Sequence, residues 1–185
     1  MATNQQSFMN QRSYTLEGIV LKRSNLGETD RLVTLLTQEQ GKFVCIAKGV
    51  RKLNSSKRAY LEPGNIIRAF LINTKSMPLL TQAMLIDDAS KTKTSLAQIR
   101  QLMQILEIFD KLLVEQEIDQ PTFQLILEIR QALVIQKTSS IRKNLNQLIL
   151  QLGYPIPDKD KYPSILEYIK EIAERPMKSF EYLMP

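Results

Sequence analysis

The sequence predicts an α+β protein whose two kinds of structure are segregated: an N-terminal five-stranded β-barrel, followed by an all-α helical domain. In the first half, short apolar runs alternate with turn signals, which is typical of antiparallel strands. After about residue 90, the apolar residues recur at three- and four-residue steps, which is typical of helices. Hydrophobic residues make up 43% of the 185 residues, enough for a packed core.

Residues 1–14 are polar and rich in Gln and Asn, with no apolar centre. They are therefore expected to form a flexible N-terminal extension rather than a secretory signal. Five strands are then expected, with a tight turn at Gln40–Gly41, and one longer link between the third and fourth strands. Such an arrangement is typical of an OB-fold barrel, although periodicity alone also permits an SH3-like barrel. The expected strands are residues 15–22, 31–37, 42–48, 65–72 and 79–85.

The barrel domain is expected to cover residues 15–88, and the helical domain residues 89–185. A first helix is predicted from the apolar steps between Ile99 and Leu113. A second begins at Pro121, whose fixed φ suits a first helical turn. A third has Ser139–Ser140 as N-cap candidates and Gly153 as its C-terminal glycine. A final helix is expected at residues 164–174, ahead of Pro176.

Two absences limit the chemistry. The chain has no histidine, so catalytic and metal sites built on imidazole are excluded. Its single cysteine, Cys45, cannot form an internal disulfide or a four-ligand zinc site, and it is expected to be buried and inert. The carboxylates at Glu28 and Asp30, and at Asp158 and Asp160, read as loop residues. We therefore expect no catalysis, no cofactor and no metal, and a location in the cytoplasm, away from membranes.

Positive charge is concentrated in the first half. Residues 1–88 contain 12 Lys and Arg against 7 Asp and Glu, whereas residues 89–185 contain 13 against 12. Between Lys42 and Arg58 there are six basic residues and no acid. This distribution favours a polyanionic partner for the barrel.

Several short motifs in the barrel resemble one known family. Glu17–Lys22 (EGIVLK) and Gly27–Arg31 (GETDR) are followed in order by Leu36–Thr37, Gly41–Lys42, Ala47–Arg51 (AKGVR), Leu61–Pro63 and Leu80–Ala83. Each is weak alone, but together, in this order, they resemble the opening of the RecO proteins of bacteria. In the second half, Leu152–Pro155 (LGYP) is similar to the point where many RecO proteins enter a four-cysteine zinc module. That module is absent here, and residues 175–183 resemble the usual end of the family, which suggests an internal deletion.

The resemblance implies a recombination mediator of the bacterial cytoplasm, associated with the nucleoid. Such a protein binds single- and double-stranded DNA, anneals complementary strands and helps RecA to load on DNA covered by single-stranded DNA-binding protein. The resemblance also implies binding to RecR and docking of the acidic C-terminal tail of single-stranded DNA-binding protein on the helical domain. An OB-fold module that binds RNA in translation or RNA processing is the alternative. A structural adaptor without nucleic-acid binding is a third possibility.

The residues expected to contact DNA are cations of the strand ends and the following basic loop, with one aromatic side chain for base stacking. They are Lys22, Arg23, Arg31, Lys42, Lys48, Arg51, Lys52, Lys57, Arg58 and Tyr60. A solvated basic loop that only aids solubility is the alternative, and Arg31 equally well pairs with Glu28 or Asp30. The cations available to an acidic tail on the helices are Arg130, Arg142 and Lys143.

Overall fold

A computed structural model describes residues 11–173, except 53, 54, 56, 115, 159, 163 and 164. The chain divides into two compact units. The first contains Met1–Ala89 and Leu113–Ile118, and the second contains Ser90–Leu112 and Asp119–Pro185. Most of the predicted N-terminal extension, and residues 174–185 with the predicted family-like ending, lie outside the described residues.

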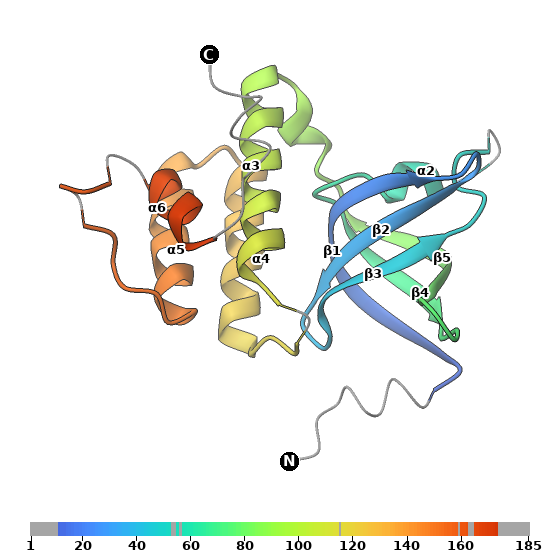
Figure 1. The fold of residues 1–185 in the computed structure, drawn as a ribbon. Coiled ribbons are helices and arrows are strands. Elements are labelled where there is room, and N and C mark those ends of the chain that lie inside the picture. The colour runs from blue at the N-terminus through green and yellow to red at the C-terminus, as the bar shows by residue number, and fades with distance from the viewer. Residues whose placement is uncertain are drawn as a thin grey trace. The chain divides into compact units, whose positions relative to one another are not determined.

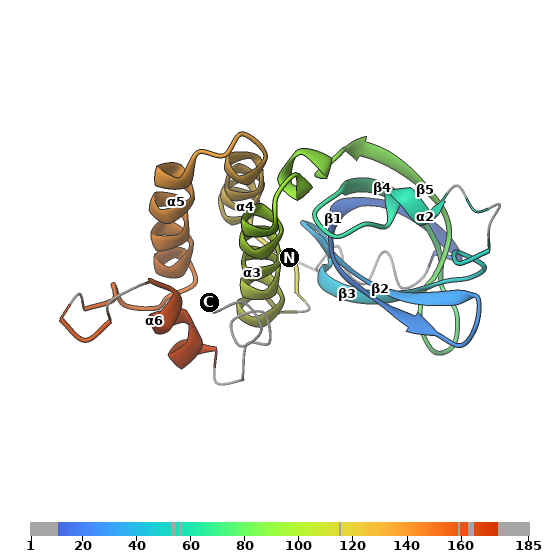
Figure 2. The ribbon, with the colours of Figure 1, turned by 90° about the horizontal axis from the view of Figure 1, so that it is seen from above.

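The first unit is a closed barrel with the strand order β1-β2-β3-β5-β4, as the predicted OB-fold requires. Figure 2 shows the strands as a ring. Each predicted strand is present, and β1 is longer at both ends than residues 15–22. The strands are β1 (Ser13–Leu26), β2 (Asp30–Thr37), β3 (Gly41–Ala47), β4 (Ile66–Ile72) and β5 (Leu79–Asp87).

Strand β1 closes the barrel by pairing with two neighbours in succession. Its first half, from Ser13 to Ile19, is antiparallel to β4, and its second half, up to Leu26, is antiparallel to β2. A register shift between Val20 and Lys22 marks the bend. On the other side, β3 and β5 share only two parallel pairs, Ile46 with Leu79 and Ala47 with Leu80. The barrel is therefore held least tightly between β3 and β5.

The alternating inward residues of the strands form the core. Cys45 is fully buried among them, as predicted, and burial raises the pKa of its thiol to about 12. Tyr60 and Phe43 are half-buried and pack against the same core. Its buried members include Leu16, Val20, Val33, Leu35, Ala47, Leu61, Ile67, Leu71 and Leu80.

The polar link between β3 and β4 contains a short helix, α2 (Lys57–Tyr60), which the sequence analysis did not predict. Asn65 holds this helix in place. Its side-chain amide donates to the carbonyl oxygens of Ala59 and Tyr60, both at 3.2 Å, and its Oδ1 accepts from the backbone N–H of Ala89 at 3.0 Å. Asn65 is buried, so these bonds satisfy polar atoms that would otherwise be costly.

Residues 113–118 belong to the barrel unit although they lie between two helices in the sequence. They run along the turn between β2 and β3. The N–H of Lys42 donates to the carbonyl of Val114 at 3.1 Å, and the N–H of Ile118 donates to the carbonyl of Gln38 at 2.8 Å. The predicted first helix ends one residue before Leu113 because this residue is buried with the barrel unit.

The second unit is helical, as predicted. It contains a short 3-10 helix, η1 (Ser90–Lys93), followed by α3 (Leu96–Leu112), α4 (Gln120–Val134), α5 (Thr138–Gln151) and α6 (Ile165–Ile172). Helices α3, α4 and α5 lie side by side in both views (Figure 1). In the described part of the chain, no helix is both long and apolar enough to cross a membrane.

Two helix starts differ from the prediction. Asp119 caps α4 by accepting a hydrogen bond from the N–H of Thr122 at 3.0 Å, so this helix begins one residue before Pro121. Helix α5 begins at Thr138, with no side-chain cap, and Ser139 and Ser140 lie in its first turn. The reason is the tight turn at Gln136, whose positive φ of 58° lets α5 follow α4 directly. Gly153 ends α5 as predicted, with a φ of 85°.

Candidate nucleic-acid interface

Two loops meet at the end of the barrel where β1 gives way to β2 and where β3 ends. The carbonyl of Thr29 accepts from the N–H of Arg51 at 2.9 Å, and Asp30 Oδ1 accepts from the N–H of Gly49 at 2.8 Å. The guanidinium of Arg51 donates to the carbonyl of Gly27, also at 2.9 Å. These three bonds form a loop clamp, by which we mean the connection between residues 27–30 and 49–51.

Asp30 is the acceptor at the centre of the loop clamp. The N–H of Gly49, followed by the hydroxyl of Thr29 at 2.8 Å, lowers the pKa of its carboxyl group. Nearby Lys48 and Lys52 lower this pKa further. Asp30 therefore stays ionised and fixes the start of the basic loop.

The predicted cations of this loop are exposed beside the loop clamp. Lys48, Lys52 and Arg58 are all exposed, as is Arg51, although Arg51 also serves the clamp. Lys22 is exposed on β1. These side chains can exchange water for phosphate oxygens at little cost, which is what sequence-independent binding of a nucleic-acid backbone needs.

Arg23 and Arg31 lie deeper. Arg23 forms an ion pair with Glu62, with Nη2 and Oε2 2.8 Å apart. Arg31 is only 8% exposed, and its charged neighbours are Arg23, Glu62, Arg58 and Arg51 rather than Glu28 or Asp30. Burial first, then the neighbouring guanidinium of Arg23, lowers the pKa of Arg31. The charges of Arg23, Arg51 and Arg58 thus repel that of Arg31, and Glu62, which pairs with Arg23, opposes them.

Three predicted residues have other surroundings. The ammonium of Lys57 donates to the carbonyl oxygens of Thr81 and Lys48, at 3.1 and 3.4 Å, so it bridges the weakly paired strands β3 and β5. Lys42 is the second residue of β3, six residues before Lys48, or about 20 Å along the chain. Tyr60 packs its ring against the barrel core.

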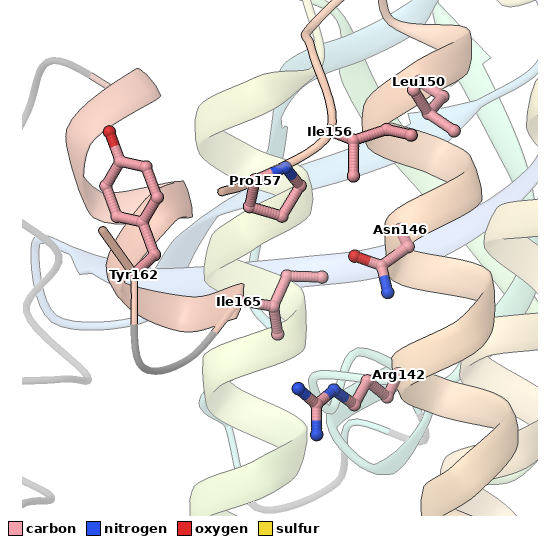
Figure 3. Close-up of a pocket in the computed structure, with 7 residues that line it drawn as sticks. All are labelled: Arg142, Asn146, Leu150, Ile156, Pro157, Tyr162 and Ile165. Atoms are coloured by element: carbon pink, nitrogen blue, oxygen red, sulfur yellow. The ribbon is translucent and has the colours of Figure 1, made fainter. Parts of the chain in front are cut away.

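The predicted cations of the helical unit also differ from one another. Arg130 is 1% exposed inside the helices, and Lys143 is exposed. Arg142 lines a pocket of about 200 Å³, together with Asn146 and Leu150 on the same face of α5. The opposite wall comes from Ile156, Pro157 and Tyr162 in the connection after α5, and from Ile165 in α6. Figure 3 shows Arg142 at one end of this lining and Leu150 with Ile156 at the other.

Aromatic and charged contacts hold the pocket wall. Tyr168 donates its hydroxyl to the carbonyl of Pro155 at 2.7 Å, and its ring meets that of Tyr162 edge-on, with centroids 5.0 Å apart. The ammonium of Lys161 pairs with Glu171 at 3.0 Å and lies 4.7 Å from the centroid of the Tyr162 ring. The pocket is therefore apolar at one end and cationic at the other, and contacts of Lys161 and Tyr168 hold its wall in place.

Sequence reasoning missed the loop clamp, the bridging role of Lys57 and the pocket wall. One usable signal was present for Arg31, because residues 31, 33, 35 and 37 alternate on one side of β2, and Val33 points into the core. For the pocket, the four-residue steps from Arg142 to Asn146 and Leu150 place these side chains on one helical face. Nothing comparable marked the partners of Lys57, which are backbone carbonyls.

Comparisons with known proteins relate the sequence of this chain to one family. The model of the family "Recombination protein O N terminal" matches residues 9–89. The DNA repair protein RecO of Shouchella clausii is 30% identical over 148 residues, covering 78% of this chain and 57% of that protein. The RecO of Heliobacterium modesticaldum is 35% identical over 101 residues, covering 55% and 37% respectively. The RecO of Bifidobacterium longum is 41% identical over 70 residues, covering 38% and 29%.

The chain spans about half the length, or less, of the curated relatives it matches. Among solved structures, a chain of the S. pombe Stn1-Ten1 complex is 16% identical, with a TM-score of 0.33, over 52% of this chain and 77% of that one. A similarity this low carries no argument about fold or function.

Proposed function

Because this chain belongs to the RecO family through its N-terminal domain, we propose that it serves DNA repair and homologous recombination by binding single-stranded DNA. The observation that carries the proposal is the group of exposed cations, Lys48, Arg51, Lys52 and Arg58, in and after a loop whose start the loop clamp fixes at one end of the barrel. Exposed cations bind phosphates without reading bases, and a recombination mediator needs such sequence-independent binding.

The proposed activity is that of a binding protein and involves no catalysis. It binds single- and double-stranded DNA and anneals complementary strands, because cations reduce the repulsion between two phosphate backbones. It assists the loading of RecA on DNA covered by single-stranded DNA-binding protein, and RecR is its proposed partner. The matching relatives are named DNA repair proteins RecO, which supports the part of the proposal that concerns DNA repair.

The test is fluorescence anisotropy with labelled oligo-dT over a salt series, with a structured RNA as competitor. If five cations contact phosphates, the logarithm of affinity falls against that of salt with a slope of about −3.5, at about −0.7 per contact. RNA that outcompetes oligo-dT at physiological salt would point instead to the RNA-binding alternative. No binding even at low salt would contradict both.

A triple charge reversal locates the binding surface. Replacing Lys48, Lys52 and Arg58 by Glu removes three exposed cations while leaving the loop clamp intact. We expect the salt slope to flatten by about 2, since three contacts are lost at about 0.7 each. The matched control reverses three exposed lysines of the helical unit, Lys91, Lys137 and Lys143, which changes the net charge equally. Equal losses in the two variants would show that only overall charge matters.

The pocket beside Arg142 supports a second part of the proposal, the docking of the acidic tail of single-stranded DNA-binding protein. An apolar cavity with one cation at its end suits an acidic peptide whose last side chains are apolar. We expect Arg142→Glu to abolish binding of a labelled peptide of that tail. Lys143→Glu, on the next residue of α5 but outside the pocket lining, is the control and should retain most of the affinity. If both variants bind equally, the tail docks elsewhere.

A further inference from the structure

Arg31 occupies a position where a cation is unusual. It starts the inward side of β2, two residues before Val33, whose side chain is part of the barrel core. Its Nη1 atom is buried and has no hydrogen-bond partner among the described residues. A buried guanidinium nitrogen without an acceptor is costly, since it has given up its hydrogen bonds to water.

The surroundings of Arg31 increase this cost. Arg23, Arg51 and Arg58 all act on Arg31 as like charges, and Glu62 is the carboxylate that opposes them. Glu62 is itself paired with Arg23 at 2.8 Å, so its charge is already shared. Arg31 is therefore repelled by three other arginines, and a bound anion would relieve this repulsion.

The four arginines come from separate parts of the barrel unit that are tied together. Arg23 lies on β1 and Arg31 on β2, whereas Arg51 and Arg58 belong to the link after β3. The loop clamp joins this link to the start of β2 through Asp30 and Arg51. The group is thus assembled before any ligand arrives, which lowers the entropy that binding must overcome.

A phosphate is the anion that this group best fits. Guanidinium groups present paired N–H donors at the spacing of phosphate oxygens, and arginine is preferred over lysine at such sites. The cations predicted to track the nucleic-acid backbone, Lys48 and Lys52, flank the same loop. A strand lying on these lysines would carry its phosphates past the four arginines.

We propose that Arg23, Arg31, Arg51 and Arg58 form a seat for a single phosphate group, and that Glu62 holds Arg23 until the phosphate displaces it. The inference rests on the proposed function. It means that one phosphate of a bound strand occupies a defined position, whereas the other backbone contacts do not depend on which phosphate is bound. Nη1 of Arg31 is buried in the present conformation, and the proposal requires the Arg23–Glu62 pair to open before a phosphate reaches it. Glu62 acts as an internal competitor that keeps the seat closed to weakly bound anions.

The first arm of the test measures oligo-dT binding over a salt series for Arg31→Lys and Glu62→Gln. Arg31→Lys keeps the charge but loses the paired donors, and we expect affinity to fall roughly tenfold. Glu62→Gln frees Arg23, so affinity should rise and the slope should steepen by up to about 0.7. The matched controls are Arg68→Lys and Glu17→Gln, the two members of an exposed ion pair on β4 and β1 whose atoms lie 2.6 Å apart. Both controls should leave affinity and slope near those of the wild type.

The second arm uses inorganic phosphate and needs no DNA. We compare phosphate with chloride at equal ionic strength. We expect phosphate to raise the melting temperature of the wild type and of Arg68→Lys, and to raise that of Arg31→Lys by less. A shift here without any wild-type binding to oligo-dT would support a seat for free phosphate and overturn the proposed DNA function alone. Sensitivity to Arg31→Lys only in the DNA arm would assign the seat to backbone phosphate.

Matched results for Arg31→Lys and Arg68→Lys in both arms would overturn the proposal. If Arg31→Lys does not fold, the Glu62→Gln variant provides the test, because it removes only the half-buried ion-pair partner of Arg23. A Glu62→Gln variant that binds oligo-dT with the affinity and slope of Glu17→Gln would then overturn the proposal equally.

Discussion

At the scale of single residues, Asp30 joins two segments that lie far apart in the sequence. Its one carboxylate accepts from Gly49 and Thr29, and it thereby connects β2 to the basic loop. The sequence placed Asp30 in a turn, but its partner Gly49 lies 19 residues away. A hydrogen bond between a side chain and a distant backbone amide leaves no periodic pattern, so it could not have been predicted.

The lowered pKa of Asp30 makes a pH-dependent prediction. A carboxyl group whose pKa is lower in the folded than in the unfolded state stabilises the fold above its unfolded pKa, and this stability is lost as pH falls through the folded pKa. We therefore expect Asp30→Asn to lower the melting temperature at pH 7, and the difference from the wild type to vanish in acid. Thermal melts across the acid range measure this. Glu28→Gln, in the same turn and exposed, is the control. A constant difference at every pH would contradict the assigned role.

At the scale of elements, the strands and their barrel were predictable, and the side-chain bridge near the β3–β5 pairing was not. Alternating apolar residues in β2 and β4 and the turn signal at Gln40–Gly41 mark elements in any single sequence. The seam between β3 and β5 instead depends on Lys57, whose ammonium bridges two carbonyls. Lys57 was expected to bind DNA because its charge is visible in the sequence, whereas its acceptors are backbone atoms common to every residue.

Gly41 tests how much the returning segment 113–118 contributes to the barrel unit. Its φ is 62°, and an added Cβ would lie 2.1 Å from the carbonyl oxygen of Gln116 and 2.6 Å from that of Val114. Gly27 has a similar φ of 59° but nothing within 4 Å of an added Cβ. In both Gly→Ala variants, the left-handed backbone lowers the free energy of unfolding by about 1 kcal/mol, because alanine is disfavoured at positive φ. Only Gly41→Ala must also displace the segment, and we expect it to cost about 1–3 kcal/mol more.

Urea denaturation of the two variants provides the measurement. A larger loss of unfolding free energy in Gly41→Ala than in Gly27→Ala would assign the difference to the contact with residues 113–118. Equal losses would mean that the segment moves aside without cost.

At the scale of the whole molecule, the chain crosses between its two units after Ala89, after Leu112 and after Ile118. The uneven charge, with the excess in residues 1–88, predicts nucleic-acid binding by the barrel, and the change of apolar period predicted the two kinds of structure. The gathering of four arginines and the pocket beside Arg142 depend on how distant segments come together. Such sites follow from tertiary structure, so composition and spacing indicated their ingredients without their geometry.

The return of residues 113–118 to the turn between β2 and β3 has a consequence during synthesis. A ribosome releases the hairpin long before it has made Val114 and Ile118, whose backbone atoms complete the bonds of Lys42 and Gln38. Until then, the backbone N–H of Lys42 and the carbonyl of Gln38 in the nascent barrel form hydrogen bonds with water instead. The barrel therefore reaches its final form only after the first helix of the other unit has been translated, which couples the order of folding to the order of synthesis.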